Sequence, residues 1–323
     1  MRLIDRDATR AALPFGPLIA ALRQMFVDGC EAPLRHTHAL TSTDGSSLGT
    51  VLIMPAWQPG RYLGIKTVNI FPGNSLQGLP GLHATYGLYD ASTGVPLAQL
   101  DGNEITARRT AAASALAASF LARPDAANLL IVGAGRVGSL LPEAYRAVRP
   151  IRRVQVWDRT PAHGLALVAR LQAGGIDAVP AHDLASAARR ADIVSCATLS
   201  TQALVQGAWL APECHLDLIG SFTAHMREAD DACFVGARIV VDSVEALQKS
   251  GDLLGPLASG AILPADVGGT LADLCQGAVR GSAAIGQRTV FKSVGSALED
   301  LAAAVLVYES RMRPGSRSSE PAS

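Results

Sequence analysis

The chain has 323 residues, which is enough for two domains with separate hydrophobic cores, since single domains commonly run to roughly 100–200 residues. Its 28 lysines and arginines are balanced by 28 aspartates and glutamates, so the formal net charge is zero. A chain without a basic field does not attract nucleic acid or anionic lipid, and this balance favours a small-molecule partner.

Hydrophobic residues make up 49% of the chain and charged residues 17%, a composition that favours a buried α/β core and an oligomer interface over disorder. The five cysteines are scattered and form no C-x-x-C pair, so we interpret them as reduced, buried thiols. The first ten residues lack the apolar core of a signal peptide, and no stretch reaches the roughly 18 uninterrupted apolar residues of a membrane span. These features predict a cytoplasmic protein.

The first part of the chain combines helices and strands. Apolar residues recur at helical spacing over 13–28, and strand-like runs follow at 48–57 and 61–71. Residues 84–102 predict a hairpin that extends the same sheet, and an alanine-rich helix is expected over 103–122. This pattern indicates an α+β domain.

From residue 128 onward, short apolar runs alternate with helical segments. The predicted strands are NLLIVGAG, RRVQVWD, DAVPA, DIVSCAT, HLDLIGS, RIVVDS and, at 289–295, TVFKSVG. Such alternation predicts a doubly wound parallel sheet.

A glycine motif follows the first of these runs. Gly133, Gly135 and Gly138 have the G-x-G-x-x-G spacing between an apolar strand and a helical stretch, the context that a dinucleotide-binding Rossmann fold requires. Gly133 would permit the tight turn, Gly135 the approach of the pyrophosphate, and Gly138 the packing of helix on strand, with the phosphates at the helix N-terminus. The residues assigned to the NAD(P)H cofactor here are Gly133, Ala134, Gly135, Arg136, Val137 and Gly138.

The cofactor's adenine ribose is assigned to Asp158, which ends the second strand 20 residues after Gly138. Its carboxylate would repel a 2'-phosphate, whereas the guanidinium of the neighbouring Arg159 would bind one, so the choice between NADH and NADPH stays open. Thr198, at the end of DIVSCAT, is also assigned to the cofactor site.

These patterns divide the chain into two domains. We expect a substrate-binding and oligomerisation domain over 1–110, completed by a C-terminal helix at 296–310, and an NAD(P)-binding Rossmann domain over 111–295. The tail at 311–323 has the composition of a disordered end.

Three segments outside the Rossmann half combine basic residues with turn formers, around Arg35, Lys66 and Arg109. Three cations that converge on one pocket would imply an anionic substrate. At these segments the sequence resembles the ornithine cyclodeaminase/mu-crystallin family, which includes alanine dehydrogenases of the archaeal type and ketimine reductases. The resemblance extends over nearly the whole chain through MPAW, KTVNIFPGN, the Arg109-Thr110 pair, GAGRVG and FKSVGSALED.

The resemblance implies that Arg35 and Arg109 bind the substrate carboxylate, that Lys66 lies beside the reacting carbon–nitrogen centre, and that Ser293 approaches both the substrate and the nicotinamide. Without the resemblance, the two arginines would be interpreted as surface or structural ion-pair residues. Lys66 lies inside an apolar strand, where a buried ammonium needs a partner.

One position departs from ornithine cyclodeaminase, in which an aspartate thought to handle the amino groups follows the fifth Rossmann strand. Phe222 stands there in this chain and cannot accept a proton or pair with an ammonium, and we expect it to form a buried aromatic wall. The segment GSFTAHMRE instead resembles family members that reduce cyclic imines.

We therefore expect a homodimeric NAD(P)H-dependent reductase that converts Δ1-pyrroline-2-carboxylate to L-proline, or the six-membered Δ1-piperideine-2-carboxylate to L-pipecolate. The alternatives are an ornithine cyclodeaminase, an alanine dehydrogenase and a mu-crystallin-like binding protein without catalysis. His36 and His38 would share one face of a strand, but no carboxylate or cysteine cluster completes a metal site, so no metal is expected.

Overall fold

The computed structural model describes residues 1–281 and 285–312 and divides into two compact units. Unit 1 comprises Met1–Arg109 together with the chain from Ser296 onward, and unit 2 comprises Thr110–Gly295. The division falls within one continuous helix, α3 (Gly102–Leu121). The combination of a Rossmann fold and an α+β domain that the sequence predicts is confirmed.

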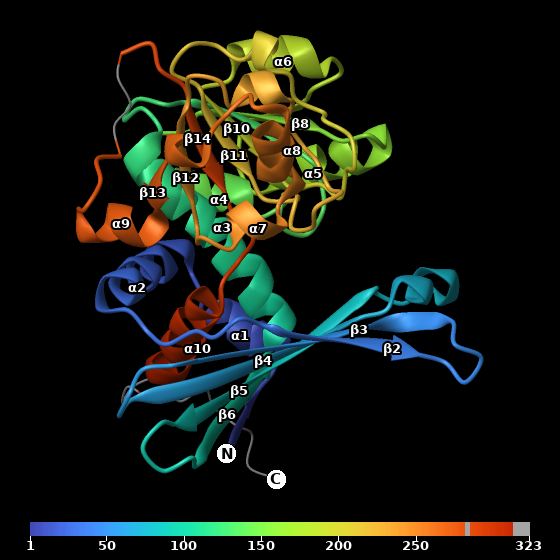
Figure 1. Cartoon of the computed structure of the whole chain (residues 1–323), viewed down its shortest axis with the longest axis vertical. Coiled ribbons are helices and arrows are strands. Elements are labelled where there is room, and N and C mark those ends of the chain that lie inside the picture. The colour runs from blue at the N-terminus through green and yellow to red at the C-terminus, as the bar shows by residue number, and fades with distance from the viewer. Residues whose placement is uncertain (282–284, 313–323) are drawn as a thin grey trace. The chain divides into compact units, whose positions relative to one another are not determined.

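Unit 1 contains a six-stranded sheet with the order β1-β6-β5-β4-β3-β2, antiparallel except for the β1–β6 pair. Its other elements are two helices before β2, a short 3-10 helix and the C-terminal helix α10, which packs against β3, β4, β5 and α2 (Figure 1). The bounds are β1 (Arg2–Ile4), α1 (Arg6–Ala11), α2 (Phe15–Asp28), β2 (His36–Thr41), β3 (Ser47–Trp57), β4 (Tyr62–Ile70), η1 (Pro72–Gln77), β5 (Leu82–Asp90), β6 (Pro96–Asp101) and α10 (Ala297–Met312).

Strand β4 shows how this sheet positions functional residues. Side chains alternate between the two faces of a strand, and in β4 Gly64, Lys66 and Val68 are the buried set. Lys66 thereby lies on the buried face of β4, where its side chain contacts α10.

Unit 2 contains an eight-stranded parallel sheet with the order β13-β12-β14-β11-β10-β7-β8-β9 (Figure 1). The run β9-β8-β7-β10-β11 has the 3-2-1-4-5 order of a Rossmann fold. The strands are β7 (Asn128–Val132), β8 (Arg153–Trp157), β9 (Ala178–Pro180), β10 (Ile193–Cys196), β11 (His215–Leu218), β12 (Arg238–Val241), β13 (Val267–Thr270) and β14 (Thr289–Lys292). The helices are α4 (Leu141–Arg146), α5 (Pro161–Ala173), α6 (Leu184–Arg190), α7 (Ala246–Lys249), α8 (Gly251–Ser259) and α9 (Leu271–Gln276), with 3-10 turns η2 (Gly207–Trp209), η3 (Asp231–Cys233) and η4 (Pro264–Asp266).

The central strands of unit 2 are buried on both faces, which explains their continuous apolar runs. The polar residues within them therefore need partners. Asp217 in β11 accepts hydrogen bonds from Ser195 (2.5 Å), Tyr145 (2.8 Å) and Ser114 (3.0 Å). Burial raises the pKa of Asp217 to about 6 despite these three donors.

Several predictions about local structure are wrong in detail. The helix expected directly after the glycine motif begins only at Leu141, because residues 136–140 form turns. Pro142 explains the delay: proline is tolerated in the first turn of a helix but not in its interior. Strands β1 and β13 were not expected; β1 has three residues and β13 reads VGGT, so neither carries a clear apolar pattern.

Two further expectations need correction. All five cysteines are free thiols, but only three are buried, since Cys30 and Cys275 are partly exposed. Arg311 and Met312, which were assigned to the tail, belong to α10, and the rest of that segment, 313–323, lies outside the described residues. Over the described part of the chain, no helix has the length and apolar character to cross a membrane.

Candidate active site

A cluster of buried charges lies in unit 1 around Lys66. The Lys66 side chain is 2% exposed, and its Nζ lies 2.6 Å from Oδ2 of Asp300, in the first turn of α10. The other oxygen of Asp300 accepts a hydrogen bond from Nε of Arg109 (2.8 Å), and Nη1 of Arg109 donates to Glu299 (2.5 Å). Asp300 thus joins two of the cations that the sequence singled out.

The surroundings change the protonation of this lysine. Burial lowers the pKa of Lys66 to about 8, and the positive charges of Arg109 and Arg35 act in the same direction, while Asp300 opposes them. Burial also acts to raise the pKa of Asp300, but Arg109 and Lys66 outweigh it and hold that pKa below its usual range. The result is a buried ammonium that can hold or release a proton near neutral pH.

Arg35 lies just before β2 and is partly buried. Its effect on the pKa of Lys66 shows that its positive charge acts on the same cluster. Of the three cations that the sequence assigned to the substrate, Lys66 and Arg109 are joined through Asp300, and the charge of Arg35 contributes to lowering the pKa of Lys66.

Tyr86, on β5 directly opposite Lys66, was not anticipated. Its side chain is fully buried, and its ring passes so close to Gly64 that any β-carbon at that position would overlap with the phenol group. Burial, followed by the charge of Asp300, raises the pKa of Tyr86, so the phenol stays protonated. Tyr86 thus borders the cluster and requires a glycine at position 64 of β4.

Sequence reasoning also missed Glu299 and Asp300 as site residues. The available signal was a pair of adjacent carboxylates inside the otherwise apolar segment SALEDLAAAVLV. Because buried carboxylates require compensating charges, such a pair indicates ion-pair partners elsewhere in the fold. Their partners come from α3 and β4, which only the tertiary structure reveals.

In unit 2, the glycine motif forms the turn after β7. Gly133 has a φ of 103°, which favours glycine, and a β-carbon there would lie 2.7 Å from the carbonyl oxygen of Ala197. A β-carbon on Gly138 would overlap with the carbonyl of Gly133, so this position also excludes larger residues. Gly135 has no described atom within 4 Å of such a β-carbon, and this open space fits a ligand that approaches the backbone.

Asp158 follows β8 and contacts the same loop. Its Oδ2 accepts the N–H of Ala134 and its Oδ1 the N–H of Thr160, both at 2.8 Å. Asp158 therefore supports the glycine loop. Arg159 is exposed beside it.

The remaining residues assigned to the cofactor also follow parallel strands. Thr198 comes after β10, and Ser293 comes directly after β14, where its N–H donates to the carbonyl oxygen of Leu218 (3.1 Å). The carboxyl ends of parallel strands are where such sheets bind ligands, so the residues present fit a nicotinamide dinucleotide.

Comparison with known proteins identifies the family of this chain. The sequence profile described as the ornithine cyclodeaminase/mu-crystallin family matches residues 10–314. The chain belongs to that family. The family resemblance inferred from the sequence motifs is thereby confirmed.

Three relatives show the extent of the similarity. It is 43% identical to the Delta(1)-pyrroline-2-carboxylate reductase of Paracoccus denitrificans, over 85% of this chain and 89% of the relative. The structure of the Thermococcus litoralis Delta(1)-pyrroline-2-carboxylate reductase, in complex with NADH and L-proline, superposes with a TM-score of 0.89 at 30% identity, covering 97% of this chain and 98% of the other. An archaeal alanine dehydrogenase dimer with bound NAD superposes with a TM-score of 0.88 at 28% identity, covering 97% and 96%.

Phe222, which replaces the cyclodeaminase aspartate, lies in the loop after β11 of unit 2. Phe222 is 44% exposed in this chain, so the expectation that it forms a buried aromatic wall is wrong. His36 and His38 are both exposed on β2. Within the residues that the structure covers, no group of three or more histidine, cysteine or acidic side chains is arranged to hold a metal ion.

Proposed function

We propose that the protein is an NAD(P)H-dependent reductase of cyclic imino acids, with Δ1-pyrroline-2-carboxylate as substrate and L-proline as product, and with the six-membered analogue as a second substrate. The observation that carries this proposal is the buried Lys66–Asp300 ion pair (2.6 Å) beside Arg109 and Arg35. The two relatives named as reductases of this substrate support it.

The cationic cluster suits recognition of a small carboxylate. A guanidinium carries five N–H donors, and the two hydrogen bonds from Arg109 to Asp300 and Glu299 leave donors for a substrate carboxylate while holding the group in one orientation. Arg35 is the second candidate for that carboxylate. Groups that are already fixed in place lower the entropic cost of holding the substrate in the reactive orientation.

Lys66 is proposed to supply the proton. Bound NADH or NADPH would supply a hydride to the imine carbon, and reduction of the C=N bond then needs one proton at the nitrogen. Lys66 holds that proton on Nζ, and its lowered pKa eases release near neutral pH. Asp300 keeps Nζ in place by their ion pair.

The cofactor is assigned to the carboxyl edge of the sheet in unit 2, with Asp158 at the adenine ribose and Thr198 and Ser293 farther along that edge. A homodimer is part of the proposal, since the archaeal alanine dehydrogenase relative is described as a dimer. A cytoplasmic location stays a prediction from the sequence.

The wild-type protein tests the proposed function directly. It should oxidise NADH or NADPH with Δ1-pyrroline-2-carboxylate and release little or no ammonia from L-ornithine supplied with catalytic NAD⁺. The reason is that deamination needs a group to manage two amino groups, and Phe222 cannot do this. Pyruvate with ammonia and the six-membered imine serve as comparison substrates.

Each alternative function gives a different result in this assay. Robust conversion of ornithine to proline would overturn the reductase assignment in favour of a cyclodeaminase. Faster turnover with pyruvate and ammonia would indicate an alanine dehydrogenase. Tight NADPH binding without turnover of any substrate would indicate a binding protein.

Cofactor choice is predicted to depend on Asp158. Asp158→Ser should raise the ratio of kcat/KM for NADPH to kcat/KM for NADH by about tenfold or more. The reason is that the carboxylate that repels a 2'-phosphate is gone while Arg159 remains. The side chain also accepts the N–H of Ala134, so affinity for both cofactors should fall. Asp158→Asn is the matched control, since it removes the charge and keeps an acceptor for that N–H. An unchanged ratio in both variants would show that Asp158 does not line the ribose pocket.

A further inference from the structure

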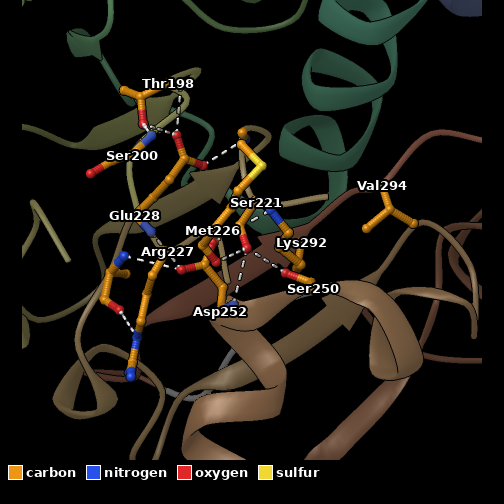
Figure 2. A network of polar contacts seen from close by, with 12 residues as sticks. Thr198, Ser200, Ser221, Met226, Arg227, Glu228, Ser250, Asp252, Lys292 and Val294 are labelled. Carbon is orange, nitrogen blue, oxygen red and sulfur yellow. Dashed lines mark hydrogen bonds and ion pairs between the residues drawn. The ribbon is translucent and has the colours of Figure 1, made fainter. Parts of the chain in front are cut away.

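Among the fully buried ionisable side chains of unit 2 that have no part in the proposed chemistry, Glu228, Asp252 and Lys292 form one cluster. They come from the loop after β11, from α8 and from the end of β14, and they lie side by side in Figure 2. Burying such groups is costly unless they are paired and hydrogen-bonded, so their arrangement calls for an explanation.

Glu228 connects the ends of two neighbouring strands. Its Oε1 accepts hydrogen bonds from the N–H (2.7 Å) and the hydroxyl (2.8 Å) of Thr198, which follows β10 (Figure 2). Its Oε2 accepts the N–H of Gly220 (2.6 Å), which follows β11. A β-carbon on Gly220 would overlap with both Thr198 and Glu228, so glycine permits this close approach.

Asp252 and Lys292 hold Glu228 in turn. Oδ1 of Asp252 accepts the N–H of Glu228 (2.8 Å) and that of Ala229 (3.2 Å), and Nζ of Lys292 lies 3.4 Å from Oδ2 of Asp252. Asp252 therefore holds the backbone at Glu228, while the carboxylate of Glu228 holds the chain just after β10 and β11.

The charge state of Glu228 is balanced by its neighbours. Burial and, to a smaller extent, the charge of Asp252 raise the pKa of Glu228, while Lys292 and the hydrogen bonds from Thr198 lower it, and the net pKa is about 7. Three donors point at the carboxylate oxygens, so the ionised form completes these bonds, whereas a proton on either oxygen would compete with them.

We propose that Glu228 is a positioning residue for the nicotinamide dinucleotide: its ionised carboxylate holds the loops after β10 and β11 in the geometry that the cofactor requires. This inference rests on the cofactor assignment of the proposed function and not on the substrate. Thr198 provides the link, because the same residue was assigned to the cofactor from the sequence.

The test is a fluorescence titration of the protein with NADH and with NADPH, without substrate. Glu228→Gln should raise the Kd of the preferred cofactor by about tenfold, since the amide nitrogen replaces one acceptor and the charge is lost. Glu245→Gln is the matched control, because Glu245 forms a partly exposed pair with Lys249 in α7 and should leave the Kd unchanged. Equal Kd values for wild type and Glu228→Gln would overturn the proposal.

The pH dependence of binding separates positioning from a purely structural role. The charged and titratable groups around Glu228 are Lys292 from β14, Asp252 from α8 and the Cys196 thiol at the end of β10. Cofactor affinity of the wild type should weaken as the pH falls from about 8 to about 6, and Glu228→Gln should remove most of that dependence. Wild-type affinity that is constant over this range would also overturn the proposal, even if the variant fails to fold.

The same titrations distinguish this inference from the proposed function. If the wild type binds a cofactor but reduces no cyclic imine, the proposed substrate is wrong, and the Kd values alone decide the role of Glu228. A wild type that binds neither NADH nor NADPH overturns both.

Discussion

Lys66→Met should lower kcat for reduction of Δ1-pyrroline-2-carboxylate by about 10²-fold or more, while NADH binding stays intact. Methionine nearly preserves the length and apolar stem of lysine but removes the charge and the proton. Asp300 keeps its hydrogen bond from Arg109 in this variant, so the fold retains a partner for the buried carboxylate. Steady-state kinetics and NADH titration together measure the two effects.

The pH profile of the wild type supplies a second measure of the same role. The pKa of Lys66 is lowered to about 8, so the protonated, proton-donating form predominates below that pH and is lost above it. The rate of imine reduction should therefore decline as the pH rises through about 8. Lys249→Met, which removes a partly exposed lysine in α7, is the control and should leave kcat unchanged.

Two results would contradict this role. Near-normal turnover of Lys66→Met would remove Lys66 from the proton-transfer step. A variant that fails to fold would point to a structural ion pair, and the high-pH decline of the wild-type rate would then decide between the two roles.

Arg109→Met should have the largest effect on stability, lowering the free energy of unfolding by about 3–5 kcal/mol. The guanidinium contacts both Glu299 and Asp300, and all three side chains are buried. Its removal leaves buried carboxylates without their strongest counter-charge, which costs far more than loss of an exposed pair. Urea unfolding followed by circular dichroism measures the difference.

Arg10→Met is the matched control for this prediction. Arg10 is about half exposed and pairs with Glu104, which also contacts Arg6, so its replacement should cost less than about 1 kcal/mol. If Arg109→Met unfolds at the same urea concentration as the wild type and only loses affinity for the imino acid, Arg109 acts as a substrate ligand without a structural role.

The stability prediction rests on a residue that the sequence identified for another reason. Arg109 was assigned to the substrate carboxylate by resemblance, and the structure shows that two of its donors already contact Asp300 and Glu299. The role of Arg109 as a substrate ligand therefore stays a proposal. Its contacts with Asp300 and Glu299 indicate a structural role as well, which the resemblance did not imply.

The sequence by itself determined the features that depend on neighbouring residues. The strands around β7, β8 and β10 follow from short apolar runs, and the turn after β7 follows from Gly133 and Gly138, whose positions exclude a side chain. Hairpin β5–β6 and helix α3 were also predicted close to their observed bounds. These are local signals, because backbone conformation and the burial pattern of one element are set within a short stretch of chain.

Only the tertiary structure decided which distant residues meet. Strand β14 lies between β11 and β12 although it follows both in the chain, and this places Lys292 beside Asp252. The buried carboxylate Asp300, from the last helix, meets Lys66 from β4. Such pairs depend on the order of the strands and on where a helix packs. The sequence shows that a buried charge needs a partner, but many residues at any separation along the chain could be that partner, so the sequence does not identify it.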